Sequence, residues 1–255
     1  MDFFDQLLTY TYLRSSSLSL LLDSVQQATP TITQKSGREM MAEALTGRIR
    51  SDSAMLRQGA KNATEASNIA DIVASSASTI VDNLTEMLAL AQEVKADSTK
   101  GAVNGVKFTA LAQGITSTIA NSKYNNISLL DKSGWTGDSR LTVSADGNSA
   151  TVKIQTGYDN SNFKLNDMSY LNSLSSVDLS SGTLDLDALI SSLSTNVTTA
   201  TIIYNGNDAL SDAYASESEF LVKQADILTK AAEDAMPDEE DPLLRDLGSI
   251  ISLLS

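Results

Sequence analysis

Hydrophobic positions recur by alternating steps of four and three residues along the N-terminal half of the chain, from Leu45 to Val94. Asp52 alone is charged among them, and small residues fill the first half of the series. A repeat of 3.5 residues is typical of the seam of a coiled coil, and no proline interrupts residues 38–97. The positions of this seam are Leu45, Ile49, Asp52, Leu56, Gly59, Ala63, Ala66, Ala70, Val73, Ala77, Ile80, Leu84, Met87, Ala91 and Val94.

The length of this pattern decides between two interpretations. An ordinary core helix is the alternative to a coiled coil, but sixty helical residues span roughly 90 Å. A compact chain of this length would have a radius of gyration of about 18 Å. The sequence therefore favours an elongated helix, or one that is broken at its Gly- and Ser-containing stretches.

Two further helices are predicted from the same periodicity. One covers about residues 103–121, and the other begins near Leu184 and continues to Pro237, where the acidic stretch 238–241 follows. The apolar stripe of the first is Phe108, Leu111, Ile115 and Ile119. That of the second is Leu189, Leu193, Val197, Ala200, Ile203, Leu210, Tyr214, Leu221, Ala225, Leu228, Ala232 and Ala235.

The middle of the chain changes to a period of two. Residues 141–144 and 151–155 alternate apolar and polar side chains, and Ala145-Asp146-Gly147-Asn148 between them is a turn signal. This predicts a β-hairpin. A further turn is expected at residues 123–126, and short strands, turns and loops are expected up to Gly182.

The expected fold class is mainly α with a small β insert, in which long antiparallel coiled-coil helices from the two ends enclose a middle domain that contains a β-hairpin. The two ends of the chain add amphipathic or short apolar helices, with a break at Pro30. The predicted domains are 1–36, an N-terminal helix; 37–130, N-terminal rod helices; 131–183, a small β-rich outer domain; 184–236, a C-terminal rod helix; and 237–255, a C-terminal helix.

Composition excludes several kinds of chemistry. Among 255 residues there is no cysteine and no histidine, which rules out disulfides, Cys/His zinc sites and a Ser-His-Asp triad. A formal net charge of −14 argues against nucleic-acid binding. No basic segment precedes an apolar stretch at the N-terminus and no apolar run reaches 18 residues, so neither a cleaved signal peptide nor membrane insertion is expected.

Several segments match a set of short sequence motifs in the same order along the chain. Ala42–Ile49 and Met55–Ala63 are similar to the motifs Ala-Ile-Ala-x-Arg and Gly-Leu-x-Gln-Ala-x-x-Asn-Ala, and Val152–Gly157 is similar to an Ile-Gln-Val-Gly hairpin. In these motifs the chain resembles the bacterial flagellin family. The other similar segments are Thr64–Ala70, Asn83–Ala91, Tyr124–Leu130, Ile227–Ala231 and Ile250–Leu254. Together they cover about residues 38–157 and 189–255.

The resemblance implies a secreted structural subunit that assembles into a helical filament of the flagellum for motility. Terminal helices would line the filament core, export chaperones and filament cap proteins would be partners, and no cofactor, metal or enzymatic activity would be needed. Residues expected at assembly interfaces are Leu56, Ala63, Ala66, Ala70, Val73, Ala77, Ile80, Leu84, Met87, Leu221, Leu228, Ile250, Leu253 and Leu254.

Particular positions match or depart from the family pattern. Arg48, Gln58 and Asn62 match its motif residues, whereas Glu86 and Leu88 stand where the family's Leu-Gln-Arg-Val-Arg-Glu-Leu stretch carries arginines. That stretch is the contact surface for an innate immune receptor of flagellins, so the resemblance predicts weak recognition of this chain. The Leu-Ser-Ser-Gly-x-Arg-Ile pattern before the first rod helix is missing, and an acidic insertion stands near residues 236–241.

Alternatives to a filament subunit remain at this stage. They are a hook–filament junction protein, an unrelated secreted coiled-coil adaptor or translocator, and an enzyme that uses paired carboxylates such as Asp185 and Asp187 or the cluster 238–241. A solvated acidic surface accounts for these carboxylates more simply, because no other polar group converges on them in the sequence.

Overall fold

The computed structural model describes residues 37–234. The chain divides into two compact units, Leu45–Met236 and a second unit made of Met1–Ala44 with Pro237–Ser255. Of the second unit only the first turns of a helix, up to Ala44, are described. The predicted helices at residues 1–36 and 237–255 lie outside the described residues. The fold below is that of the described part of the larger unit, residues 45–234.

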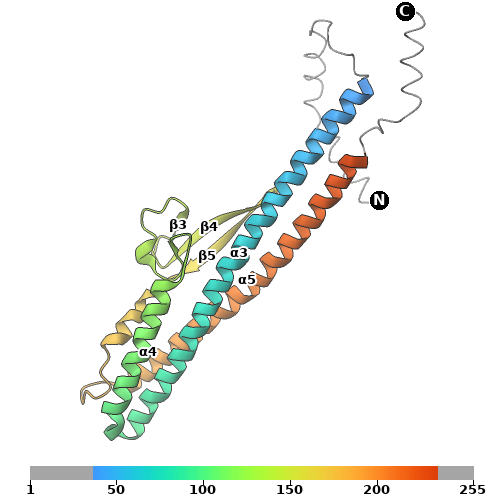
Figure 1. The fold of residues 1–255 in the computed structure, drawn as a ribbon. Helices are drawn as coiled ribbons and strands as arrows, with labels where there is room; N and C mark the ends of the chain where they lie inside the picture. Colours follow the sequence, from blue (N-terminus) through green and yellow to red (C-terminus); the bar gives the residue numbers. More distant parts are fainter. Residues whose placement is uncertain (1–36, 235–255) are drawn as a thin grey trace, which may run out of the picture. The chain divides into compact units, whose positions relative to one another are not determined.

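Three long helices form most of the described chain (Figure 1). They are α3 (Gly37–Ala96), α4 (Gly101–Asn121) and α5 (Leu186–Asp234), and they confirm the prediction of a mainly α fold. α3 is one uninterrupted helix, so the break considered from its Gly and Ser content does not occur. Asp97 begins the connection to α4: its carboxylate accepts a hydrogen bond from the Thr99 backbone N–H and caps the short 3₁₀ helix η2 (Ser98–Lys100).

α5 packs along α3 in the opposite direction. The Ser53 hydroxyl near the start of α3 donates to the Ala225 carbonyl near the end of α5 at 2.9 Å, and further along α3 the Ser67 and Ser211 hydroxyls lie 3.0 Å apart. Residue numbers that rise on one helix as they fall on the other define an antiparallel pair. Because the groups that meet are small, the two helix backbones can approach closely.

Within residues 37–234, five strands make two small antiparallel sheets. β1 (Lys123–Tyr124) pairs with β2 (Ile127–Ser128), and the larger sheet has the order β3-β4-β5. Its strands are β3 (Leu141–Val143), β4 (Ser149–Thr156) and β5 (Asp159–Asn166). Leu141 pairs with Val152, which confirms the predicted hairpin around Gly147.

The two-residue turn between β1 and β2 has a direct sequence cause. Asn125 and Asn126 have φ angles of 48° and 66°. A type I′ hairpin turn requires positive φ at both central residues, and asparagine tolerates that conformation better than most side chains. The turn predicted at residues 123–126 is confirmed at Asn125 and Asn126, whereas Lys123 and Tyr124 belong to strand β1.

One apolar cluster joins α3, α4, α5, the larger sheet and the 3₁₀ helix η4 (Ser169–Ser176). The single tryptophan, Trp135, follows the 3₁₀ helix η3 (Lys132–Gly134) and is 1 % exposed. Its indole N–H donates to the Ser128 carbonyl at 2.7 Å, so its polar atom is satisfied inside the core. Side chains of the segment 131–183 thus share a core with the helices. The boundaries predicted for this segment as a separate outer domain stay predictions.

At two places the buried face differs from the sequence periodicity. Leu45 and Leu210 are 37 % and 38 % exposed, whereas the nearby polar residues Thr46 and Ser211 are buried. Ser211 meets Ser67 across the helix pair, so a hydroxyl contact occupies the position that periodicity assigned to a leucine. Small hydrogen-bonded side chains fit a narrow space between helices that a leucine would overfill.

A buried carboxylate makes the sheet region sensitive to acid. Asp167 is 8 % exposed, accepts hydrogen bonds from the backbone N–H groups of Lys132 and Ser169, and lies 3.1 Å from the Lys132 Nζ. Burial alone raises the pKa of Asp167, but the hydrogen bonds from Ser169 and Lys132 outweigh burial and lower that pKa below its ordinary value.

Because the folded-state pKa is lowered, the ionised carboxylate stabilises the fold above the unfolded-state pKa, and this stabilisation fades as pH falls through the folded-state value. We expect Asp167→Asn to lower the free energy of unfolding by about 2 kcal/mol at pH 7 and by much less at pH 2. Denaturant unfolding at both pH values measures this, with the exposed Asp82→Asn as control. Equal losses at the two pH values would contradict the role assigned to Asp167.

Candidate assembly interface

The turn between β4 and β5 brings the sheet to the helix pair. β4 ends at Thr156 and β5 begins at Asp159, so Gly157 and Tyr158 form a two-residue loop. Gly157 has a φ of 68°, whereas the φ of Tyr158 is not positive. This is the pattern of a type II′ turn, in which glycine occupies the first central position.

Gly157 lies directly against α3 at Gly59. A Cβ atom added to Gly59 would lie 2.1 Å from the Gly157 nitrogen and 2.8 Å from its Cα. No carbon atom can be accommodated at such distances, so the approach of the turn to the helix requires a glycine at position 59. We call this contact, with its neighbours Asn62 and Gln155, the hairpin junction.

Amide side chains of α3 hold the strand that leads into the turn. The Asn62 Nδ2 donates to the Gln155 carbonyl at 2.7 Å, and the Gln58 Nε2 donates to the Asn62 Oδ1 at 2.9 Å. The second bond orients the Asn62 amide so that its nitrogen faces the strand. Two residues one helical turn apart therefore act together on a single backbone carbonyl.

The same hairpin also contacts α5. A Cβ on Gly157 would lie 3.3 Å from the Leu56 Cδ2 of α3 and 3.6 Å from the Leu221 Cδ2 of α5. Further along β5, the Ser161 hydroxyl lies 3.1 Å from the Tyr214 hydroxyl of α5. The hairpin junction is thus a three-way contact among α3, α5 and the β4–β5 turn.

Sequence reasoning found the parts of this junction but not their contact. Gln58 and Asn62 belong to one motif and residues 152–157 to another, and the sequence predicts β5 only as part of a region of short strands and loops. A signal for β5 exists: Phe163 and Leu165 alternate with polar residues and are both buried.

The residues expected at assembly interfaces lie mostly inside this chain. Those on α3, together with Leu221, are buried, and Leu228 is partly buried against the second apolar cluster. Ile250, Leu253 and Leu254 lie outside the described residues. The buried residues are Leu56, Ala63, Ala66, Ala70, Val73, Ala77, Ile80, Leu84 and Met87. Their described contacts are within one chain, and a role between copies stays a prediction.

The remaining motif positions differ in exposure. Arg48 and Glu86 are exposed, whereas Leu88 is partly buried and packs against the core. Asn62 and Gln58 take part in the hairpin junction. Of the two positions where the resembling family carries arginine, the charge change therefore reaches solvent at Glu86, while Leu88 contributes to packing.

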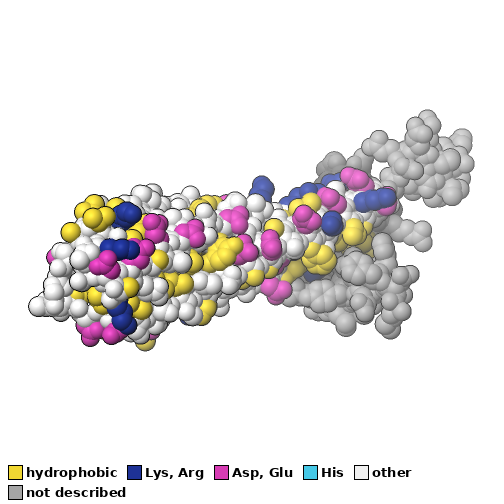
Figure 2. Space-filling view, turned by 90° about the horizontal axis from the view of Figure 1, so that it is seen from below, with side chains coloured by type: hydrophobic (Ala, Val, Ile, Leu, Met, Phe, Trp, Pro, Cys, Tyr) yellow, Lys and Arg dark blue, Asp and Glu magenta, His cyan; other side chains and the backbone are white. Residues whose placement is uncertain are grey.

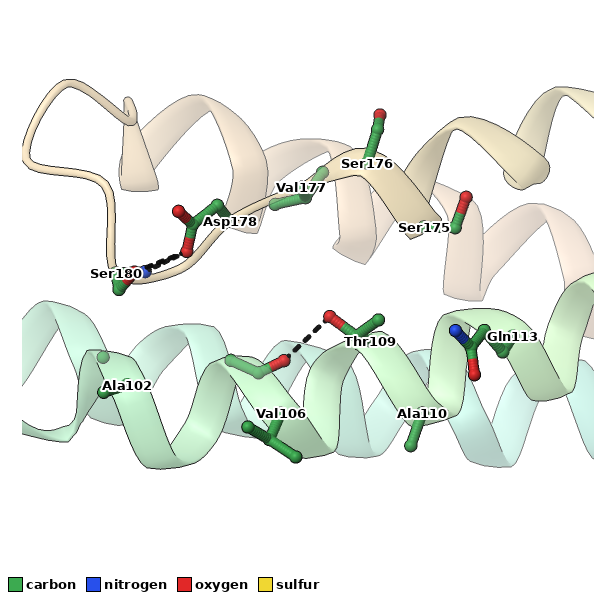
Figure 3. Close-up of a pocket in the computed structure, with 12 residues that line it drawn as sticks. Ala102, Val106, Thr109, Ala110, Gln113, Ser175, Ser176, Val177, Asp178 and Ser180 are labelled. Carbon is green, nitrogen blue, oxygen red and sulfur yellow. Dashed lines mark hydrogen bonds between the residues drawn. The ribbon is translucent and has the colours of Figure 1, made fainter.

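A groove lies beside α4, between this helix and residues 175–180 (Figure 3). Its volume is about 690 Å³, and most of the side chains that line it are small or carry a hydroxyl group. Asp178 accepts hydrogen bonds from the Ser180 side chain and backbone, which lower the pKa of Asp178. The Thr109 hydroxyl donates to Gly105 in its own helix. These polar groups bond within their own segments and do not converge on a common point in the groove.

Apolar side chains are also exposed on α5. Ile202, Phe220 and Ile227 are 67 %, 58 % and 49 % exposed. Figure 2 shows exposed hydrophobic side chains beside acidic ones along one face of the described chain. The apolar stripe predicted for α5 follows its buried side and does not include these exposed residues.

Within residues 37–234 no group of three or more Asp, Glu, His or Cys residues is placed to hold a metal ion. No helix in that range combines the length and apolar character needed to cross a bilayer. No protein-family model and no characterised protein sequence matches the chain.

Proposed function

We propose that this protein is a structural subunit that self-assembles into an extracellular flagellin-like filament. The observation that carries the proposal is the hairpin junction. The segments that resemble the flagellin family lie far apart in the sequence, yet Gly59 and Asn62 on α3 contact Gly157 and Gln155 on the hairpin. A coincidental likeness of separate segments would give no reason for them to meet.

The helix pair supports a coiled-coil architecture. From Leu56 to Val94 every position of the predicted seam is buried. A seam with this spacing and many alanines suits long, closely packed helices rather than a substrate cavity. Such helices would bury apolar surface between copies without any catalytic group. Export chaperones and a filament cap would be partners in this function, and the location would be the flagellum outside the cell.

Electron microscopy of the purified full chain tests the proposal. Long filaments are the expected result, short rings would indicate a junction protein, and neither form under any condition would contradict the proposed function.

Removal of residues 242–255 is expected to abolish filaments while the helical circular dichroism signal is kept. The apolar residues of this segment, such as Leu253 and Leu254, resemble the family's terminal assembly segment. Deletion of Ser255 alone is the matched control and should leave assembly unchanged. Normal filaments from the shorter chain would show that this segment is not needed.

A further inference from the structure

An apolar row runs along the side of α5 that does not face α3. Its members recur by steps of seven and four residues, so they lie on one face of the helix. They are exposed and are Ile202, Ala209, Ala213, Phe220 and Ile227. We call this set the outer α5 row.

Acidic side chains border the outer α5 row on one edge. They are Asp208, Asp212 and Glu219, spaced by four and then seven residues, and all three are exposed. No ion pair joins them to any residue in the described range 37–234 except a long, exposed contact of 3.8 Å between Glu219 and Lys223. The edge is therefore a row of carboxylates without a strong partner in the described chain.

The start of α3 carries the opposite arrangement. Arg50, Arg57 and Lys61 are exposed and spaced by seven and then four residues, with Ala54 on the same face between them. Beside them Gly47 has no atom within 4 Å of an added Cβ, so the surface there is open. We call Arg50, Arg57 and Lys61 the α3 basic row.

The two rows match when their helices run in opposite directions. The basic residues of α3 are separated by seven and then four residues, and the acidic residues of α5 by four and then seven. When the helices are antiparallel, each basic residue therefore lies opposite an acidic residue in a single register. The opposed pairs are Lys61 with Asp208, Arg57 with Asp212, and Arg50 with Glu219. In that register the bulky Phe220 is level with position 49 of α3, between the small residues Gly47 and Ser51.

Within one chain the rows do not meet. Ser67 lies opposite Ser211, so Lys61 is level with about residue 217 of its own chain. Arg57 pairs with Asp226, 2.7 Å away, rather than with Asp212. That pair is about half exposed on both sides, so exchanging it for another carboxylate changes the free energy little.

We propose that the outer α5 row is covered by the α3 basic row of a second copy of this chain, packed antiparallel in the register of the three charge pairs. This rests on the self-assembly in the proposed function and defines one contact of it. Because each copy presents both rows, the contact is heterologous and repeats from copy to copy. Copies then point the same way and are offset by about nine residues, or ~13 Å along the helix axis.

Charge exchange tests the contact. Lys61→Asp alone and Asp208→Lys alone should each raise the concentration needed for assembly by about tenfold, because each replaces an attractive pair with a repulsive one. An equimolar mixture of the two variants should assemble close to the wild-type concentration, because each variant supplies the charge that the other needs. Lys153→Asp and Asp82→Lys, outside both rows, are matched controls that should assemble like the wild type.

Cross-linking tests the register. The chain has no cysteine, so introduced thiols are unambiguous. A mixture of Ala54→Cys and Ala213→Cys chains, oxidised during assembly, should give mainly the mixed disulfide dimer, because these positions lie across the proposed contact. Dimers of like chains only, or no dimer, would overturn the register.

The outcomes separate the two proposals. If wild-type filaments form and the single charge variants assemble normally, or their mixture fails to recover, this packing is wrong and the filament function stands. If the wild type forms no assembly, the proposed function fails and this contact fails with it.

Discussion

Replacing Leu84 by aspartate should lower the free energy of unfolding by roughly 5 kcal/mol, enough to unfold a marginal domain. Leu84 is fully buried on α3 in the main apolar cluster. The substitution removes apolar contacts and leaves a carboxyl group in a site without a charge partner, where it must be desolvated or protonated. Thermal and denaturant unfolding, followed by circular dichroism, measure the loss.

Two variants serve as controls for Leu84→Asp. Leu84→Met keeps the volume and should cost less than about 1.5 kcal/mol. Glu86→Ala changes an exposed residue two positions away and should alter stability by no more than about 0.5 kcal/mol. If Leu84→Asp has the same free energy of unfolding as Glu86→Ala, the α3 seam does not form the core described above.

Gly59→Ala should destabilise the fold by about 3 kcal/mol even though alanine favours helix. The new Cβ would lie 2.1 Å from the Gly157 nitrogen, a backbone atom that cannot move aside without displacing the whole turn. The hairpin must separate from α3, which also strains the bond from Asn62 to Gln155. Hydrogen exchange of the β4 and β5 amides should then rise in advance of global unfolding.

Gly47→Ala on the same helix is the matched control for Gly59→Ala. No atom lies within 4 Å of its added Cβ, so the helix propensity of alanine should stabilise the fold by up to about 1 kcal/mol. Dilute protein keeps the measurement on single chains. The two glycine variants should thus change stability in opposite directions, and a gain for both would mean that the turn does not press on α3.

The sequence alone determined the elements that depend on local order. The 3.5-residue repeat placed α3, and alternation around a Gly-containing turn placed the β3–β4 hairpin, whose pairing register the structure then supplied. Both follow from a single rule: apolar side chains repeat with the period of the element that buries them. The pair Asn125 and Asn126 similarly predicts the tight turn that these residues form.

Only the tertiary structure decided which side chains meet across long separations. Periodicity assigned burial to Leu45 and Leu210, but Thr46 and Ser211 are buried instead. At Ser211 the distance between the paired helices sets this choice, because its hydroxyl meets Ser67 there, and that distance depends on both helices at once. The hairpin junction has the same origin: Gly59 has to be glycine because Gly157, nearly a hundred residues later, approaches to a distance that leaves no room for a Cβ atom. A periodic pattern indicates which face of a helix is buried. Which residues pack against that face depends on the side chains of several segments together, so the pattern of one segment does not predict them.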